Sequence, residues 1–523
     1  YEPPPCRVDV QVNDGRGRPT SARVLVTDQL GAVDLAGPDA YAADPGERDV
    51  GLHSILAVDG HARVYLDRAR YRLLATRGLR HDVGAAWIDC SSSDRVEVEL
   101  EVQRVVDTPG WLTTDLHVHS GRSADAYVPD RVRYRSAVVA GLDVIVMTDH
   151  NMVIDPAVPL DEISLEGGEG VPVVRGLPGV EARLGMSDPE NEEDEDSYGH
   201  LNAFPLDPDQ PLPETHNEQV SEHIVAFRER QRVAPFEGSE DGVVLQLNHP
   251  RGIQFAVDEE PRTKVHALFN QLGFDREEPV ESDGNDWLVR TELPGNSILD
   301  LDAVEVLNRF SWPLYLEVRA DWFALLNQGF SLTATGNSDS HAFEVEQLGL
   351  PMNLVACPAS GSLDVACFVD AVQGGNLTVT SGPVVDLWVG HGQRGVGPGE
   401  SLTAPGQVTV RARVRAAPWV PVSEVRLVRN GAVVDVQIVD GGRMEPGSTR
   451  EMLDRELEWT LDLDRDSWLL VEAGWPLEAE LPENPEDALG DYALLAPGYT
   501  PVGFTNPVRV DADGVMGWEA PGL

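Results

Sequence analysis

Nine histidine and carboxylate side chains in the middle of this 523-residue chain have the types and spacing of metal ligands. His117 and His119 form an H-x-H pair, and Asp339 and His341 form a D-x-H pair. Side chains two residues apart on a strand point to the same side, so both members of a pair can reach one ion. Nitrogen and carboxylate ligands without thiolate suit zinc, iron or manganese. The candidate ligands are His117, His119, Asp125, His150, Glu181, His200, His249, Asp339 and His341.

The elements that must position these ligands are predicted from apolar runs, each followed by polar residues. The run Val144 to Met147 precedes His150, and the run Val243 to Leu247 precedes His249. Such runs are typical of strands buried on both faces. Residues 130–140 carry a helical pattern that ends at a glycine. Strand–helix–strand repetition predicts a βα-type barrel or a doubly wound sheet, and the carboxyl ends of parallel barrel strands share the face where active sites form.

Four motifs at these strand ends resemble the PHP (polymerase and histidinol phosphatase) metallohydrolase superfamily. They are Asp115–Ser120, Thr148–Asn151, Asn248–Pro250 and Asn337–His341. A finer similarity to the CehA/McbA-type branch, named after carbaryl hydrolases, lies in Gly179–Glu181, Gly199–Asn202, Val304–Asn308 and Thr380–Pro383. The resemblance implies an α/β fold over residues 109–395, a distorted seven-stranded βα barrel.

The resemblance also implies two or three divalent transition metal ions, with zinc ahead of iron or manganese. The first ion would bind His117, His119, Glu181 and Asp339. The second would bind Asp125, His150 and His341, although the superfamily often has histidine where this chain has Asp125. The third would bind Glu181, His200 and His249, so that Glu181 bridges two ions.

The reaction expected of such a site is hydrolysis by a metal-bridging hydroxide, because divalent ions lower the pKa of bound water towards neutrality. Asp115 and Asp149 lie beside ligands and could orient imidazoles, or they could simply form hydrogen bonds at strand ends. A phosphoesterase acting on a phosphate mono- or diester is the favoured function. The alternatives are a carboxylic or carbamic ester hydrolase, and an exported binding protein whose metal-binding barrel is structural.

Substrate-binding groups are harder to predict. Arg122, Arg251 and Arg309 each lie within three residues of a strand-end motif, where a guanidinium could bind phosphate with two hydrogen bonds. A surface salt bridge is the alternative role for each. The acidic run from Asp188 to Asp196 precedes His200 and is either a solvated loop or a calcium or anion-repelling loop at the mouth of the site.

The two ends of the chain have a β pattern. Val8, Val10 and Val12 alternate with polar residues, which predicts a half-buried strand. Asn430-Gly431 between apolar alternations predicts a β-hairpin. We therefore expect β-sandwiches over residues 1–108 and 396–523, on either side of the barrel.

Charge and composition exclude several classes of protein. Lysine and arginine number 40 against 88 aspartates and glutamates, so the formal net charge is −48. Such a surface repels duplex nucleic acid and anionic lipid. No stretch approaches the roughly 18 consecutive apolar residues that a membrane helix needs. The expected partner is a small-molecule ester or phosphoester.

The four cysteines bear on location. Cys6 and Cys90 bracket the first predicted sandwich, and Cys357 and Cys367 lie close together in sequence. With a proline-rich start at Tyr1, where a cleaved secretory signal is one explanation, this pattern favours an exported bacterial protein, periplasmic or extracellular. In that case Cys6 pairs with Cys90 and Cys357 with Cys367. Four free thiols in a cytoplasmic enzyme are the alternative.

Overall fold

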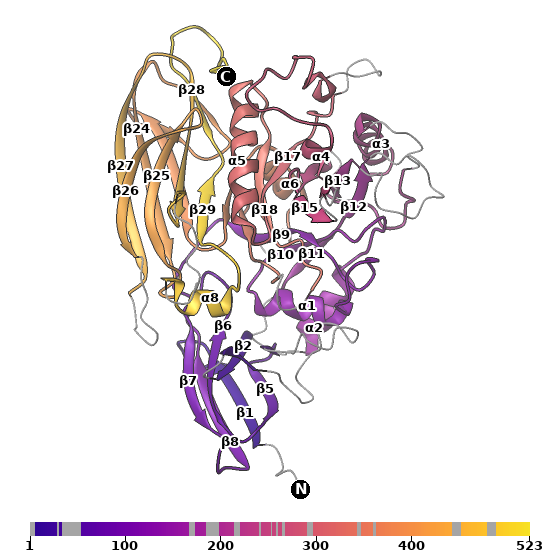
Figure 1. Ribbon diagram of the computed structural model, residues 1–523, viewed down its shortest axis with the longest axis vertical. Coiled ribbons are helices and arrows are strands. Elements are labelled where there is room, and N and C mark those ends of the chain that lie inside the picture. The colour runs from indigo at the N-terminus through magenta and orange to yellow at the C-terminus, as the bar shows by residue number, and fades with distance from the viewer. Residues whose placement is uncertain are drawn as a thin grey trace.

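The computed structural model of the chain is built mainly from β-sheets. The N-terminal strands lie at one end of the molecule, and the middle and C-terminal strands lie side by side beyond them (Figure 1). Of the helices in the described residues, none is both long and apolar enough to cross a membrane. The described residues are 6–28, 31–33, 54–166, 173–184, 198–213, 220–239, 242–252, 254–257, 260–263, 267–289, 297–342, 347–358, 362–441, 451–478 and 488–523.

Two small sheets at the N-terminus enclose one apolar core. The first has the strand order β5-β1-β8, and the second has the order β3-β2-β6-β7 with β4 beside β2. Buried positions alternate along β1, as its sequence period of two predicts. Val8, Val24 and Leu73 are among the core residues between the sheets. The strands are β1 (Cys6–Asn13), β2 (Ala22–Asp28), β3 (Gly31–Ala32), β4 (Ser54–Ala57), β5 (His61–Leu66), β6 (Arg70–Thr76), β7 (Gly84–Asp89) and β8 (Arg95–Glu101).

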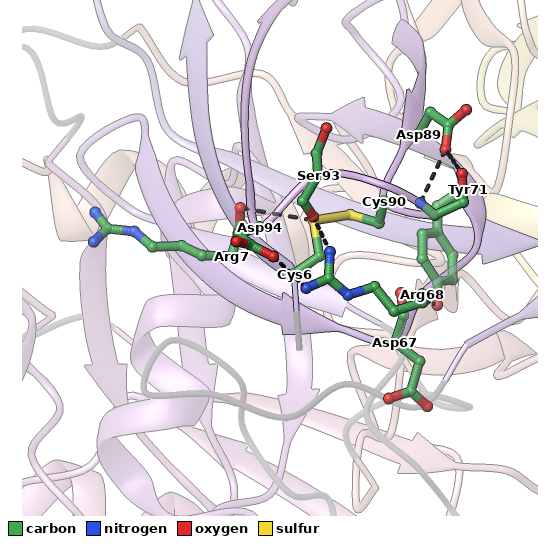
Figure 2. Close-up of a disulfide and its surroundings, with 10 residues drawn as sticks. Cys6, Arg7, Asp67, Arg68, Tyr71, Asp89, Cys90, Ser93 and Asp94 are labelled. Atoms are coloured by element: carbon green, nitrogen blue, oxygen red, sulfur yellow. Dashed lines mark hydrogen bonds and ion pairs between the residues drawn. A yellow bond between two sulfur atoms is a disulfide. The ribbon is translucent and has the colours of Figure 1, made fainter. Parts of the chain in front are cut away.

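A disulfide joins the start of β1 to the residue after β7. The Cα atoms of Cys6 and Cys90 are 5.7 Å apart, and both residues are fully buried. Figure 2 shows the Arg68 guanidinium beside this bond, where it donates to the Ser93 carbonyl and to the Asp94 carboxylate. Cys357 is likewise bonded to Cys367, with Cα atoms 5.9 Å apart. Both predicted pairings are confirmed, and disulfides of this kind are typical of exported proteins.

The N-terminal sheets meet the rest of the chain at two glycines, Gly78, which lies against the Ala140 carbonyl, and Gly141, which lies against the Arg77 carbonyl. Gly78 and Gly141 have φ of 74° and 71°, a region that favours glycine. A Cβ on Gly78 would overlap the Ala140 carbonyl, so the two backbones can pack this closely only without side chains. On the C-terminal side, the Trp419 indole donates to the His81 carbonyl at 2.7 Å. All three parts of the chain therefore meet here.

One sheet of 11 strands runs from the middle of the chain into its C-terminal part. Its main path is β11-β10-β9-β19-β20-β29-β28-β25-β26, with β30 and β23 attached at β28. β9, β10 and β11 are parallel, whereas β19 pairs antiparallel with both β9 and β20. The strands are β9 (Leu112–Val118), β10 (Val144–Met147), β11 (Arg175–Pro178), β19 (Met352–Val355), β20 (Leu377–Thr380), β23 (Ser401–Thr403), β25 (Val422–Arg429), β26 (Ala432–Gly441), β28 (Ser467–Gly474), β29 (Val502–Thr505) and β30 (Val508–Asp511).

A second middle sheet has the order β12-β13-β14-β17-β18. Its first three strands pair antiparallel and its last three pair parallel. Isolated bridges, Val118 with Ser340 and His150 with Glu181, bring it against the 11-stranded sheet at two points. The strands are β12 (Val180–Leu184), β13 (Gly199–Phe204), β14 (Val244–Asn248), β17 (Ala303–Asn308) and β18 (Thr333–Asn337), beside the separate hairpin β15 (Gln254–Val257) and β16 (Glu260–Thr263).

The expected seven-stranded βα barrel is wrong. The described residues contain seven α-helices and many strands in several sheets, and their strands do not close into a barrel. A βα repeat requires parallel neighbours, but β12, β13, β19 and β20 are antiparallel to theirs. The apolar runs could not reveal this, because β9 is buried at all seven positions and such burial looks the same for either strand direction.

A four-stranded sheet with the order β22-β21-β24-β27 packs its apolar face on the C-terminal part of the 11-stranded sheet. The predicted hairpin is confirmed, with Asn430 and Gly431 at φ of 51° and 85° between β25 and β26. The pairing of β20 with β29 crosses the expected boundary at residue 395, and the division into domains stays a prediction. The strands of the smaller sheet are β21 (Val384–His391), β22 (Arg394–Val396), β24 (Gly406–Ala416) and β27 (Leu453–Leu463).

Helix α5 lies between the middle and C-terminal strands (Figure 1). Its Arg319 donates to Glu472 of β28 through Nε at 2.5 Å and Nη2 at 2.9 Å. Arg426 of β25 donates to the same carboxylate at 3.1 Å, so a buried Glu472 holds two guanidinium groups. The helices are α1 (Asp130–Val139), α2 (Ala157–Glu166), α3 (Val220–Val233), α4 (Leu268–Gln271), α5 (Trp312–Asn327), α6 (Val365–Gln373), α8 (Asp491–Leu495) and the 3-10 turn η2 (Asp286–Leu288).

Candidate metal centre

The H-x-H pair lies at the carboxyl end of β9. His117 and His119 are completely buried, and their Nε2 atoms are 3.1 Å apart. Val118 between them points the other way into the apolar core. The period of two in a strand therefore directs both imidazoles to one point, as the sequence predicts.

Glu181 of β12 lies at the centre of the site. Its Oε2 is 3.3 Å from His117 Nε2 and 3.0 Å from His119 Nε2. Its Oε1 faces the other way, 2.9 Å from His200 Nδ1 and 3.2 Å from His249 Nε2. The two oxygens of one buried carboxylate thus face two separate sets of imidazoles.

The D-x-H pair follows β18. Asp339 Oδ1 lies 3.3 Å from His117 Nε2 and 3.4 Å from His119 Nε2. Asp125 Oδ2 lies 3.2 Å from His341 Nε2 and 3.1 Å from His150 Nε2. The side chain of Asp125 is 52% exposed, so the site opens to solvent on this side.

His150 Nδ1 is 3.3 Å from Glu181 Oε2, and His341 Nδ1 is 3.3 Å from Asp339 Oδ1, so all nine predicted ligands form one cluster. Within it, three groups of atoms could each hold an ion. The first group is His117, His119, Glu181 and Asp339. The second is Asp125, His150 and His341, as expected, together with His119. The third contains Glu181 and His200 with His150, whereas His249 lies outside it but near Glu181. The described residues therefore contain groups of buried ligands that could bind metal, and the number and identity of the ions stay predictions.

The spacing of two buried atoms within the cluster fits ligands around a cation. Asp339 Oδ1 and His150 Nδ1 are buried and form no hydrogen bond with the described residues. Tetrahedral ligands at 2.0–2.1 Å from zinc lie about 3.3 Å from one another, which matches the separations between these atoms. A cation at the shared point would satisfy both buried atoms.

Two further residues hold the imidazoles in place, although the sequence did not mark them as site residues. Glu305 Oε1 contacts His117 Nδ1 at 3.0 Å, and Ser123 Oγ contacts His119 Nδ1 at 2.8 Å. Such contacts fix the ring and leave Nε2 for a metal. Glu305 lies within the Val304–Asn308 motif, where a carboxylate inside an apolar run could have marked it, whereas nothing in the sequence distinguishes Ser123.

Asp115 and Asp149 are both fully buried and contact no ligand imidazole through a described hydrogen bond. Asp115 accepts from the backbone of Ser338 and Gly349 at 3.2 and 2.9 Å, and burial raises its pKa to about 6. Asp149 accepts from the Ser123 amide at 3.1 Å, and Ser123 in turn contacts His119. Asp149 therefore positions Ser123, which contacts the His119 imidazole, whereas Asp115 holds the backbone at Ser338 and Gly349.

The three candidate arginines lie in different surroundings. Arg122 is exposed and pairs with Asp130 at 2.9 Å. Arg251 is bound to the buried Asp321 at 2.7 Å, a contact that fixes α5. Arg309 lies within the site, where its Nε donates to Asp339 Oδ2 at 2.9 Å. Only Arg309 of the three contacts a predicted ligand in these hydrogen bonds.

The charges in the cluster support one another. Burial opposes ionisation of Glu181, but the charges of His117, His200 and His150 hold its pKa well below the usual value. Burial likewise opposes the charge on His117, but Asp339, Glu181 and Glu305 raise its pKa well above the usual value. The carboxylates are therefore ionised, and a bound cation would displace protons from the imidazoles.

Backbone strain is concentrated at the same place. Asn151, His249, Arg309 and Asp339 have φ between 27° and 53°, a left-handed region that non-glycine residues rarely occupy. Among the described residues, only Asn430 in a hairpin turn shares this property. Strain of this kind persists where surrounding structure imposes it, often at functional sites.

The acidic run from Asp188 to Asp196 lies outside the described residues. A separate acidic group, Asp466, Asp511 and Asp513, lies near β28 and β30. The chain matches no protein-family model and no curated protein.

Proposed function

We propose that the chain is a metal-dependent hydrolase of ester bonds whose substrate is a phosphate mono- or diester. The observation that carries the proposal is the position of Glu181, with imidazole nitrogens at 2.9–3.3 Å from its two oxygens. A carboxylate in this position suits a bridge between metal ions. The motif resemblance to the PHP superfamily favours the same reaction class.

Each group of side chains would hold one ion. The first ion would take His117, His119, Glu181 and Asp339, the second Asp125, His150 and His341, and the third Glu181 and His200 with a further histidine. Ions bound there supply Lewis-acid activation of water and of the ester oxygen. Nitrogen and oxygen donors suit zinc first, then iron or manganese.

The protein's own residues orient and enclose the reaction site. Glu305 and Ser123 fix the rings of His117 and His119. Burial of these histidines keeps bulk water from one side of the cluster, while Asp125 leaves the other side open. Substrate would approach from that open side.

Arg309 favours a phosphoester over a neutral ester. Its side chain is 32% exposed, and its guanidinium is held at the rim by Asp339 at 2.9 Å. A fixed positive charge beside the cluster attracts an anionic phosphoryl group and stabilises charge that develops on it. The carbaryl-hydrolase motifs favour the second candidate, a carboxylic or carbamic ester hydrolase, for which this charge has less use.

The test is a substrate screen of metal-loaded protein that pairs aryl phosphates and phosphodiesters with aryl acetates and carbamates. Turnover of phosphates alone, lost on His117→Ala, supports the proposal. The matched control is His391→Ala, because His391 is exposed on β21 and should leave turnover unchanged. Turnover of carboxyl or carbamate esters alone would replace the proposal with the second candidate, and no turnover with any metal would refute both.

We also propose export to the periplasm or the exterior. The two disulfides support it, because such bonds persist in oxidising compartments. Peptide mapping of protein from fractionated cells tests it: bonded pairs in a secreted or periplasmic fraction support export, and reduced protein in the cytosol contradicts it.

A further inference from the structure

An arginine-lined cleft of about 780 Å³ lies where the N-terminal part of the chain meets the segment before β10. Loops of the N-terminal part, between β1 and β2, between β6 and β7 and after β8, supply most of its lining, and Gly141 to Asp143 supply the rest. Asp143 directly precedes β10, whose other end leads to His150. β10 has four residues and is about 13 Å long at ~3.3 Å per residue, so the cleft and the candidate metal centre lie at opposite ends of this strand. The four arginines are Arg18, Arg77, Arg80 and Arg104.

The inner guanidinium groups are fixed in position. Arg80 is 5% exposed and donates to the Gly141 carbonyl at 2.7 Å and to Thr108 Oγ1 at 3.1 Å. Arg104 donates to the same Thr108 hydroxyl at 3.3 Å, so these two groups flank one small side chain. Arg77 donates to Thr20 Oγ1 at 3.1 Å. A cation array built this way is already ordered before any ligand binds.

One buried donor in this array, Nε of Arg77, has no hydrogen-bond partner in the described part of the chain. A buried donor without a partner costs about 1–3 kcal/mol. An acceptor with several oxygens in the cleft would satisfy this group.

The charge of the lining is unusual for this protein. Four arginines face two aspartates, Asp14 and Asp143, so the lining is net positive in a chain of net charge −48. Asp14 pairs with Arg18 at 2.7 Å, Asp143 with Arg80 at 3.2 Å, and Asp107, outside the lining, with Arg104 at 3.3 Å. Within the described residues Arg77 has no ion pair, so its charge is the least balanced of the four. Burial, together with repulsion from Arg80 and Arg104, lowers the pKa of Arg77 to about 10. An anion would relieve this repulsion.

We propose that the arginine cleft binds a small oxyanion with two negative charges, either inorganic phosphate or the phosphate group of a larger molecule. Planar guanidinium groups bind such oxyanions with paired hydrogen bonds. The cleft is larger than a phosphate ion, so it leaves room for an organic group. Because residues of the N-terminal loops and of the segment before β10 line the cleft, the bound anion ties these two parts together. This site is separate from the proposed hydrolase centre.

The test is titration of the metal-loaded protein with sulfate as a probe, followed by calorimetry and by thermal unfolding at constant ionic strength. We expect saturable binding and a rise in unfolding temperature. Arg77→Gln and Arg104→Gln should each weaken binding about ten- to a hundredfold, since each removes a charged donor. Arg232→Gln, at an exposed arginine of α3, should bind as the wild type does.

Further variants keep the two sites apart. His150→Ala changes the candidate metal centre and should leave sulfate binding in the cleft unchanged. If Arg77→Gln does not fold, Arg104→Gln decides the matter, because its side chain is 43% exposed and its loss leaves the core intact. Wild-type affinity in Arg104→Gln, loss of binding in His150→Ala, or no saturable binding would each overturn the proposal.

Competition experiments identify the form of the ligand. Inorganic phosphate and methylphosphonate are titrated against bound sulfate. Stronger competition by phosphate supports a free anion, and equal or stronger competition by methylphosphonate supports a phosphate group attached to an organic molecule. Competition by neither would overturn the proposal.

Discussion

Replacing Glu181 by Gln tests whether one carboxylate serves two metal positions. In the native site Oε1 lies 2.9 Å from His200 Nδ1, and Oε2 lies 3.0 Å from His119 Nε2. Glutamine replaces one oxygen by an NH₂ group, which cannot ligate a cation, and leaves the other oxygen neutral. Each set of imidazoles therefore loses either a ligand or the negative charge of one.

The expected magnitude follows from this geometry. Changes to groups behind metal ligands cost 10–100-fold in metal affinity. Loss of a carboxylate placed directly between the imidazoles should cost about a hundredfold or more at both positions, or about 3 kcal/mol each. The two proteins are compared after dialysis against dilute chelator. If the wild type holds three ions per chain, the variant should retain at most one, and if the wild type holds two, the variant should retain none.

The assay is elemental analysis per chain, with zinc-binding calorimetry for the affinities. Glu305→Gln is the matched control, because Glu305 contacts His117 Nδ1 from outside the cluster at 3.0 Å. It should weaken binding about 10–100-fold and keep the wild-type number of ions at saturating metal. Loss of one ion or none from Glu181→Gln, or equal losses in the two variants, would refute the bridging role.

Two further predictions concern stability. Glu472→Gln should lower the free energy of unfolding by about 3–5 kcal/mol, because it leaves two buried guanidinium groups unbalanced. Burial opposes ionisation of Glu472, but the arginines lower its pKa, so the stability difference between wild type and variant is full above the ordinary pKa of 4.5 and shrinks as the pH falls below it. A difference that grows on acidification, measured by chemical unfolding, would contradict this. Removal of the Cys6–Cys90 bond, which spans 84 residues, should lower the free energy of unfolding by about 4–5 kcal/mol. Removal of the Cys357–Cys367 bond, which spans 10 residues, should lower it by about 2 kcal/mol less. Equal losses in paired Cys→Ser variants would contradict loop entropy as the cause.

Local features of the fold follow from the sequence, but strand direction does not. The period of two in β1 and the Asn430-Gly431 turn each depend on neighbouring residues, and both occur as predicted. The barrel was wrong because β13 and β19 run antiparallel to their neighbours. Strand direction depends on how segments distant in the sequence return to the sheet, and the residues of an apolar run do not reveal it.

The candidate site was more accessible to prediction than the fold. His117 and His119 lie two residues apart on one strand, so their side chains share a face. Together with the residue types at several other strand ends, they are enough to predict metal binding. The strand ends converge although the strand directions were predicted wrongly, since Glu181 reaches the cluster from β12, which pairs antiparallel with β13. The partner of Arg251 could not be predicted, since Asp321 lies 70 residues away in the sequence. Ser123 lies only four residues after His119, but its contact depends on the loop conformation after β9, which the residue types do not show.

The central claim, that the histidine–carboxylate cluster is a metal centre, is tested most directly by anomalous diffraction at the zinc, iron and manganese edges from crystals of protein purified without chelator. We predict two or three anomalous peaks about 2.0–2.2 Å from the nitrogens and oxygens around Glu181. No peak within the cluster, or peaks only at the separate acidic group of Asp466, Asp511 and Asp513, would contradict the claim.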